Sequence, residues 1–448
     1  MGRRDGGSIN LRRTVGSERL LLRRLVDYGC IVLLRIMLDW AYLTYAAPRF
    51  SYQYHFVSNQ NYEALLLSWL VLIASIPFAF RYDERNRCTN MLVAVLYCIS
   101  FVPGTMMIAY GSVSWGYTIC YLIFWATMLY ACYFVPQVRI GYSSGRLSNV
   151  MTVTATAVLA FSVIYVSWKY TGFRFTISLA NVYDLRLEAR EFDLPWPLSY
   201  LFYAAKIAIP VLVAHYLSRK RYLFALLLGI VQLLAFSADG TKSTLFTLVI
   251  VVACYYFVKR VTISLIIRAV TLIVLTALIE YIVFDSDYIL NYGIRRLFYV
   301  PASLNIDYYQ FFSSNDLDFY RQSIFSKLGF ESPYVQSIGR TIGLYCLGSP
   351  VMNANNGLFS DAYANLGIVG CFVVPLMLVT IFRIIDMVAS GLPFPIVACV
   401  LVITAYTFIS SSFFTVLISH GLFLVCIILY FLPRSEIQGD PGEQKNSY

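Results

Sequence analysis

The residue types best suited to chemistry gather in one polar stretch, residues 285–357, which follows a long apolar segment. It holds two adjacent arginines, Arg295 and Arg296, among aromatic and aliphatic residues, and two further arginines, Arg321 and Arg340. Guanidinium groups bind phosphate oxygens with paired hydrogen bonds, and fixed cations stabilise a departing phosphate. We therefore expect a phosphate-bearing substrate here. A purely interfacial helix would carry the same adjacent arginines without that role.

Carboxyl and aromatic groups accompany these arginines. Asp307 precedes Tyr308 and Tyr309, and Asp361 follows the stretch, where small and amide residues lead into the next apolar run. A carboxylate can take the proton of an attacking hydroxyl, which makes Asp307 and Asp361 the candidate bases. The tyrosine rings are candidate contacts for sugar or lipid. Asp361 could also serve as a helix N-terminal charge that complements the helix dipole.

A second candidate site is the segment 239–243, Asp-Gly-Thr-Lys-Ser, which separates two short apolar runs. It predicts the apex of a helical hairpin, where a helix N-terminus beside Lys242 favours an anion and Asp239 is a third candidate base. Alternatively, Gly240 only turns the chain and Lys242 extends to the lipid head groups. His420 stands in the outer half of the last apolar run, as a substrate contact or as a core histidine.

Apolar runs of membrane-spanning length make up most of the chain, which is 59% hydrophobic and 13% charged. They predict an all-α, polytopic integral membrane protein with about twelve spans in a single transmembrane domain, residues 28–432. The expected spans lie near 28–47, 63–80, 91–110, 116–135, 150–168, 198–217, 222–238, 244–258, 261–284, 358–382, 393–410 and 413–432.

The distribution of basic residues predicts the orientation. Those that precede the first span are Arg3, Arg4, Arg12, Arg13, Arg19, Arg23 and Arg24. Residues 1–27 and 433–448 are therefore expected to be cytoplasmic tails, and the long loops 169–197 and 285–357 to be extracytoplasmic. The ends up to Leu22 and from Arg434 are polar and predicted to be poorly ordered. The formal net charge of +10 reflects these cytoplasmic flanks, where cations meet anionic lipids, and does not imply nucleic-acid binding.

Several charges fall within the apolar runs. Arg35 and Asp39 are one helical turn apart and predict a structural ion pair. Arg268 is close enough to the inner end of its span for its side chain to extend to the head groups. Lys206 and Glu280 are expected towards the outer side, where they are weaker candidates for a functional role.

The sequence favours neither a disulfide framework nor a metal or other cofactor. Of the ten cysteines, only Cys88 and Cys346 lie clearly in expected loops. Asp316 and Asp318 have the spacing of a divalent-cation motif, but they stand in a polar turn, where we expect them at the surface.

These features together resemble the bacterial O-antigen and capsule repeat-unit polymerases, the Wzy-type integral membrane glycosyltransferases. The resemblance spans most of the chain. It rests on the number of spans, on the turn at 237–243, on the segment 295–309 with its paired arginines and Asp-Tyr-Tyr, and on the segment 356–367.

The resemblance implies a GT-C-like fold and a polymerase at the outer face of the plasma (inner) membrane. Such an enzyme transfers an oligosaccharide from one polyprenyl diphosphate to the repeat unit on another. The cations that would stabilise the departing diphosphate are Arg295, Arg296, Arg340 and Lys242. Direct attack implies inversion at the anomeric carbon. Membrane lipids, a flippase and a chain-length regulator of the same pathway would be its partners.

Two other classes stay open. A flippase for lipid-linked oligosaccharides, or another secondary transporter, can have twelve spans, but it typically places charges at the membrane midplane and has short loops. A polysaccharide O-acyltransferase would need a histidine in or beside the membrane helices, for which His420 is a candidate. No histidine lies between residues 216 and 419, whereas the related O-antigen ligases carry one in their large outer loop. The identity of the base is thus open.

Overall fold

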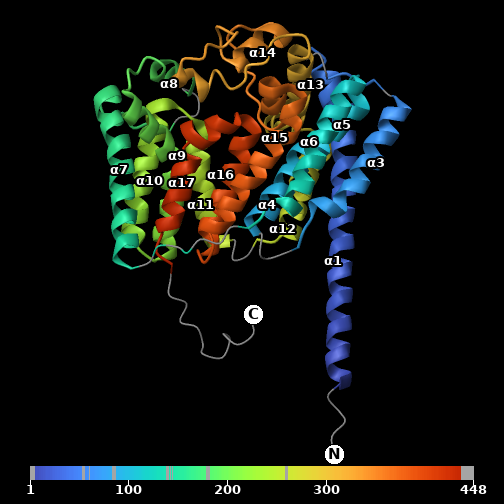
Figure 1. Cartoon of the computed structure of the whole chain (residues 1–448), viewed down its shortest axis with the longest axis horizontal. Helices are drawn as coiled ribbons and strands as arrows, with labels where there is room; N and C mark the ends of the chain where they lie inside the picture. Colours follow the sequence, from blue (N-terminus) through green and yellow to red (C-terminus); the bar gives the residue numbers. More distant parts are fainter. Residues whose placement is uncertain are drawn as a thin grey trace, which may run out of the picture. The chain divides into compact units, whose positions relative to one another are not determined.

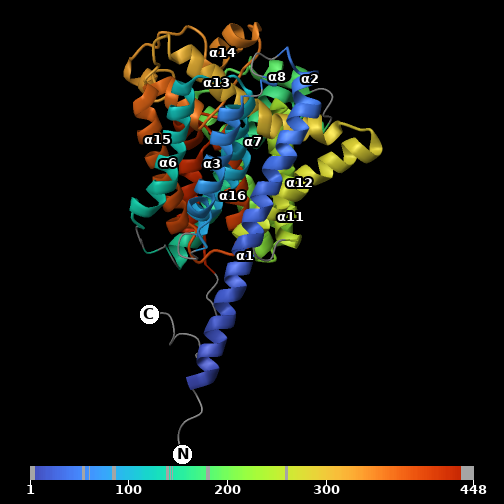
Figure 2. The ribbon, with the colours of Figure 1, turned by 90° about the vertical axis from the view of Figure 1, so that its right-hand side faces the viewer.

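The computed structural model describes residues 6–52, 56–59, 61–82, 87–137, 141, 143, 145–177, 182–257 and 261–434. Within these ranges every regular element is a helix (Figure 1, Figure 2). The helices form two compact units, where the sequence predicted a single membrane domain. The first unit comprises residues 1–136, 261–383 and 405–414, and the second comprises 137–260, 384–404 and 415–448.

The elements of the first unit are α1 (Gly6–Ala41), η1 (Tyr42–Ala46), α2 (Ala47–Arg49), α3 (Tyr62–Ala79), α4 (Arg87–Leu96), η3 (Tyr97–Phe101), α5 (Val102–Tyr110), α6 (Trp115–Phe134), α12 (Ile263–Phe284), η4 (Leu290–Tyr299), α13 (Val300–Phe312), η5 (Phe325–Leu328) and α14 (Ile338–Leu347). Those of the second are α7 (Arg146–Thr171), α8 (Val182–Ala189), α9 (Trp196–Ser218), α10 (Tyr222–Asp239), α11 (Lys242–Phe257), η6 (Thr415–Ser419) and α17 (Leu422–Phe431). Helices α15 (Phe359–Val388) and α16 (Phe394–Ser410) contribute residues to both.

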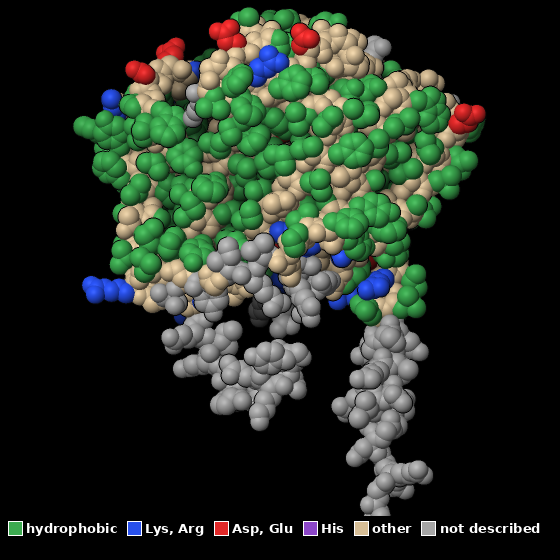
Figure 3. Space-filling model, in the orientation of Figure 1, with side chains coloured by type: hydrophobic (Ala, Val, Ile, Leu, Met, Phe, Trp, Pro, Cys, Tyr) green, Lys and Arg blue, Asp and Glu red, His purple; other side chains and the backbone are tan. Residues whose placement is uncertain are grey.

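The described part of the chain contains nine helices long and apolar enough to cross a membrane. Each coincides with an expected span. Three shorter apolar helices, Lys242–Tyr256, Phe394–Ser410 and Leu422–Phe431, stand at the other three expected positions. Hydrophobic side chains cover the flanks of the helices in Figure 3. The all-α, multi-pass architecture is thus confirmed, whereas twelve spans and a GT-C-like fold stay predictions.

The amino-terminal end of the chain differs from the expectation of a poorly ordered tail. Helix α1 begins at Gly6 and extends past the other helices of the first unit (Figure 1). Residues 1–5 and 435–448 lie outside the described residues. So do the side chains up to residue 19.

A buried ion pair lies at the centre of the first unit, as the sequence predicts. Arg35 is fully buried on α1, and its Nε donates to Asp39 Oδ1 at 2.6 Å. Its two terminal nitrogens donate to Thr105 of α5 and Ser68 of α3, at 2.9 and 3.2 Å. Because hydrocarbon offers no alternative partners, this single guanidinium connects three helices.

Removal of one member of this pair should destabilise the protein. Arg35→Leu leaves the Asp39 carboxylate buried without its cation, at a cost of about 3–5 kcal/mol. Adding Asp39→Leu should recover much of the loss, because the Ser68 and Thr105 hydroxyls keep their own backbone acceptors. Thermal unfolding in micelles, followed by tryptophan fluorescence, measures both effects. Exposed Arg146→Leu is the control, and a double variant less stable than Arg35→Leu would contradict the interpretation.

Candidate functional site

Residues 285–357 of the first unit fold into a structured cap built from η4, α13, η5 and α14 (Figure 1). The cap has its own apolar cluster. Its buried members are Leu304, Tyr308, Phe311, Phe312, Ile342, Ala354 and Ala364. The first four lie on one face of α13, because they follow the three- and four-residue spacing of a helix. The polar stretch is therefore a folded element with a core.

Two glycines let α14 approach the chain that follows it. A Cβ at Gly339 would collide with the side chains of Asn353 and Asn355, and one at Gly343 with the backbone of Met352. The Ala354 amide donates to the Gly339 carbonyl at 2.8 Å. The position of α14, and of Arg340 on it, is thus fixed by backbone contact.

Buried amide and hydroxyl groups join the cap to the start of α15. Asn356 Nδ2 donates to the Pro301 carbonyl at 2.9 Å, to Asn305 Oδ1 at 3.0 Å and to Ser360 Oγ at 2.9 Å. Ser360 Oγ donates in turn to Asn305 Oδ1 at 2.8 Å. The donors and acceptors of α13, the connecting segment and α15 satisfy each other, which makes the junction rigid.

Asp361 is an anchor of this junction. It is 3% exposed, in the first turn of α15, and accepts from the Phe413 amide at 2.9 Å, Asn365 Nδ2 at 3.0 Å and Tyr320 Oη at 3.2 Å. Burial and the Asp361 charge raise the pKa of Tyr320 well above its ordinary value, so the phenol stays a donor. The hydrogen-bond partners of Asp361 are thus neutral, and none of the predicted arginines is among them. A structural role at the start of α15 describes Asp361 better than the role of a general base.

Asp307 and the two tyrosines after it have different surroundings. Asp307 is buried on α13 near Cys346 of α14: burial, and then the Asp307 charge, raise the pKa of that thiol to about 12. Tyr308 is in the apolar cluster and donates to the Ala354 carbonyl at 3.0 Å, so its ring is buried, and its contact with substrate stays a prediction. Tyr309 is partly exposed, with its ring 4.7 Å from that of Tyr363.

The two adjacent arginines, Arg295 and Arg296, lie in different environments. Arg295 is half-buried: its Nε donates to Asn291 Oδ1 at 3.1 Å, its guanidinium lies 4.3 Å from the Phe50 ring, and burial lowers its pKa. Arg296 is exposed, 5.7 Å from the Tyr292 ring. Arg340 is also exposed. Arg296 and Arg340 therefore have guanidinium surface that a ligand can reach.

Arg321 instead holds its own loop together. Its guanidinium donates to the carbonyls of Asp318, Leu317 and Glu331 at 3.0, 3.3 and 3.4 Å. Asp318, expected at the surface, is 1% exposed because it accepts from Ser332 Oγ at 2.6 Å and the Gln322 amide at 3.0 Å. Beside these residues lies an open cavity of about 650 Å³, lined by Arg321, Gln322, Ser326, Gly329, Phe330, Glu331, Ser332, Tyr334, Val335, Gln336 and Ser337.

In the second unit, the predicted hairpin apex is confirmed. Helix α10 ends at Asp239, Gly240 takes a left-handed conformation with φ 63°, and α11 begins at Lys242. Asp239 forms a buried ion pair with Lys206 of α9 and accepts from Thr241 N and Oγ1 at 3.1 and 2.6 Å. Asp239 is therefore not an available base. Lys242 is exposed.

A proline in α9 explains why the Gln232 amide lies beside the Lys206–Asp239 ion pair. Pro210 has no amide hydrogen for the Lys206 carbonyl four residues earlier. Gln232 Nε2 donates to that carbonyl at 2.9 Å, and to the Thr244 carbonyl at 3.2 Å. Within the described residues, Gln232 Oε1, Thr244 Oγ1 and His420 Nδ1 are buried without a hydrogen-bond partner. His420 is partly buried, and it lies close enough to Lys206, the cation of the pair with Asp239, to feel its charge.

Sequence reasoning missed several residues that hold these sites. It noted Lys206 as a weaker candidate without its partner, and it did not single out Gln232, Tyr320 or Asn365. Glu280 accepts from Ser286 Oγ and the Ile289 amide, both at 2.7 Å, so it caps the end of α12. For Gln232 the available signal was an amide in an apolar run, within reach of a proline-containing neighbour.

The chain was also compared with protein-family models, curated proteins and solved structures, and none of them matches it. Arguments about function therefore rest on the chain itself.

The proximity of Asp307 to Cys346 can be measured chemically. Asp307→Asn removes a negative charge that disfavours the thiolate, so the pKa of Cys346 falls and the thiolate fraction at a given pH rises. Alkylation of Cys346 by N-ethylmaleimide at pH 8, quantified on its peptide by mass spectrometry, should become several-fold faster. Asp316→Asn, at an exposed carboxylate of the same cap, is the control. An unchanged rate in Asp307→Asn would contradict the arrangement.

Proposed function

We propose that the protein is a membrane glycosyltransferase that joins polyprenyl-diphosphate-linked oligosaccharide repeat units into a surface polysaccharide at the outer face of the plasma membrane. The observation that supports this most is the folded cap of residues 285–357. It holds arginines at fixed positions beside aromatic rings, at the end of a unit of apolar helices. A lipid-linked substrate needs both environments, because its chain is apolar and its diphosphate and sugars are polar.

The reaction makes one bond and breaks one. A hydroxyl of the acceptor sugar attacks the anomeric carbon of the donor, the bond from that carbon to the diphosphate oxygen breaks, and the lipid diphosphate leaves with the electron pair. Arg295, Arg296 and Arg340 would stabilise the developing charge. Of these, Arg295 is the best held, by Asn291 and Phe50.

The hydroxyl proton passes to a carboxylate. Asp307 and Asp361 are the candidates, and three hydrogen bonds to the oxygens of Asp361 also give that residue an anchoring role in the cap. Tyr309, whose ring is partly exposed beside Tyr363, would offer a face to a sugar. Displacement by direct attack inverts the anomeric configuration.

A secondary transporter for the same lipid-linked substrate is a second candidate, favoured by one observation. Lys206 is the eleventh residue of α9, Trp196–Ser218, and so stands near the middle of a 23-residue helix, paired with Asp239. A buried ion pair between apolar helices is typical of transport and proton pathways.

Cells that lack the native gene, complemented with single variants, separate the two functions. Arg295→Ala, Arg296→Ala, Arg340→Ala and Asp307→Asn should abolish or strongly reduce repeat-unit polymer, while single lipid-linked units still reach the outer face. One interaction made only in the transition state is typically worth ~10²–10³ in rate. Polymer length, accessible single units and protein level are measured together. Arg146→Ala is the matched control.

Asp361→Asn and Tyr320→Phe test the anchoring role. Both should lower the unfolding temperature, and Asp361→Asn should leave partial activity because its carbonyl oxygen still accepts from Phe413. Lys242→Ala measures the contribution of the exposed cation at the start of α11. Single units trapped inside would identify a transporter, and unchanged polymer in all three arginine variants would contradict the polymerase.

A further inference from the structure

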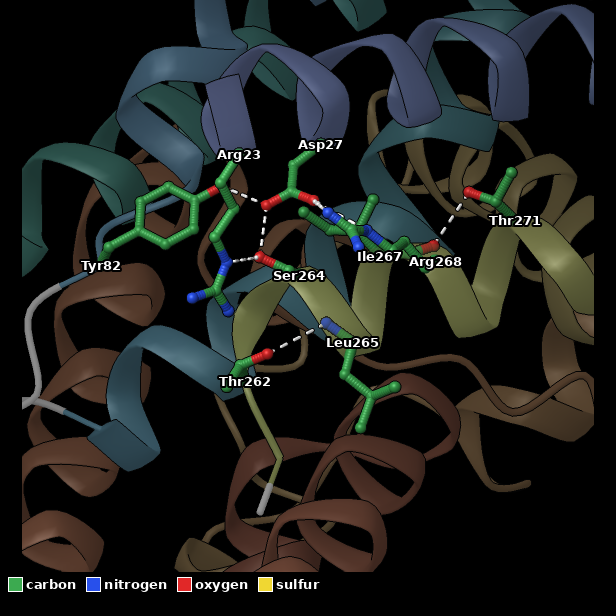
Figure 4. Close-up of polar contacts among 9 residues, drawn as sticks. All are labelled: Arg23, Asp27, Tyr82, Thr262, Ser264, Leu265, Ile267, Arg268 and Thr271. Carbon is green, nitrogen blue, oxygen red and sulfur yellow. Dashed lines mark hydrogen bonds and ion pairs between the residues drawn. The ribbon is translucent and has the colours of Figure 1, made fainter. Parts of the chain in front are cut away.

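A second polar cluster of the first unit lies away from the cap, where α1 meets α12 (Figure 4). Its centre is Asp27, which is fully buried. Asp27 Oδ2 accepts from Ser264 Oγ at 2.5 Å and Tyr82 Oη at 2.8 Å, and Oδ1 accepts from Arg268 Nη2 at 3.1 Å and Nε at 3.2 Å. Four donor atoms, three from α12 and one from Tyr82, thus fix one carboxylate. Arg268, expected to extend to the head groups, also pairs with Asp27, and about half of its side chain stays exposed.

Two further arginines of α1 join the cluster through the same neighbours. Arg23 Nε donates to Ser264 Oγ at 2.6 Å, and the Arg24 guanidinium lies 5.3 Å from the Tyr82 ring. The cluster therefore combines three guanidiniums, one of which pairs with Asp27, with one carboxylate, which leaves it with a net charge of about +2. Asp27 orients them indirectly as well as directly, because it also fixes Ser264 and Tyr82.

These guanidiniums have donors left for a ligand. A guanidinium has five N–H groups, and in the described structure Arg23 uses only Nε while Arg268 uses Nε and Nη2. The two terminal nitrogens of Arg23 point away from Asp27 in Figure 4. Arg23 and Arg24 are exposed, and the side chain of Arg268 is 49% exposed. Such groups match the oxygens of a phosphate, which accept paired hydrogen bonds.

Exposed apolar residues accompany the cluster along α1 and α12. The exposed hydrophobic residues nearest in sequence are Leu20, Leu21, Leu22, Leu25, Val26 and Leu265. A soluble phosphate compound has no use for these leucines, whereas a phospholipid places acyl chains directly beside its phosphate. Cations at the ends of apolar helices lie at the level of the head groups.

We propose that Arg23, Arg24 and Arg268 form a binding site for the phosphate of an anionic phospholipid, organised by Asp27. The lipid phosphate accepts from the free guanidinium nitrogens, and its acyl chains lie along the leucines of α1 and α12. This site is independent of the polymerase proposal, because it uses none of the residues of the cap.

Native mass spectrometry of the purified full-length protein, with equimolar phosphatidylglycerol and phosphatidylcholine, tests the site. The wild type should retain phosphatidylglycerol preferentially. Arg23→Gln and Arg24→Gln keep the Asp27–Arg268 pair, and each should weaken retention about fivefold. Arg146→Gln, at an exposed arginine outside the cluster, should leave it unchanged. Equal losses in all three variants would overturn the proposal.

Asp27→Asn separates an organised site from simple attraction. The substitution makes the chain more positive, so unspecific attraction would strengthen retention of the anionic lipid, whereas loss of the organising carboxylate weakens it. Increased retention overturns the proposal. If Asp27→Asn does not fold, Arg268→Lys, which keeps the charge and loses the paired geometry, should show the same weakening. Displacement of the lipid by millimolar inorganic phosphate would identify a soluble phosphate ligand and overturn the lipid.

Discussion

Several charges in these apolar helices meet the requirement for a partner inside the protein, which arises because hydrocarbon supplies neither donors nor acceptors. Arg35 with Asp39, Lys206 with Asp239 and Arg268 with Asp27 each meet this requirement. The last two pairs connect separate helices, and Arg35 of α1 reaches two further helices through its hydroxyl partners. Packing within each unit is therefore specified by a few polar contacts in addition to the fit of apolar surfaces.

The cap follows the same constraint with neutral groups. Amides and hydroxyls of Asn305, Asn356 and Ser360 bond to each other, and Asp361 receives its donors from Asn365, Tyr320 and a backbone amide. An arginine paired with Asp361 would be less available to an anionic substrate, because the carboxylate would compete with the substrate for it. With neutral donors, the junction is held without consuming the guanidiniums that the proposed reaction needs.

Sequence reasoning located the elements because length and hydropathy determine them: the run expected at 222–238 is Tyr222–Asp239 in the structure. It did not anticipate the burial of Tyr308, although Leu304, Tyr308 and Phe311 already have helical spacing and could have indicated a buried face. The Lys206–Asp239 pair and the burial of Asp318 were beyond reach. Lys206 and Asp239 are 33 positions apart, and their pairing depends on how α9 meets α10. Asp318 and Ser332 are 14 positions apart, and their hydrogen bond depends on how the loop between them closes.

Gln232 gives the second unit an unusual sensitivity to the length of its helices. Its single amide group serves carbonyls of both α9 and α11, one of which Pro210 leaves without a helical donor. Insertion or deletion of one residue in α10 before Gln232 would turn that side chain by about 100° around the helix. Both carbonyls would then lose it at once. Evolution can therefore substitute residues on the exposed side of α10, but insertions and deletions before Gln232 should be excluded.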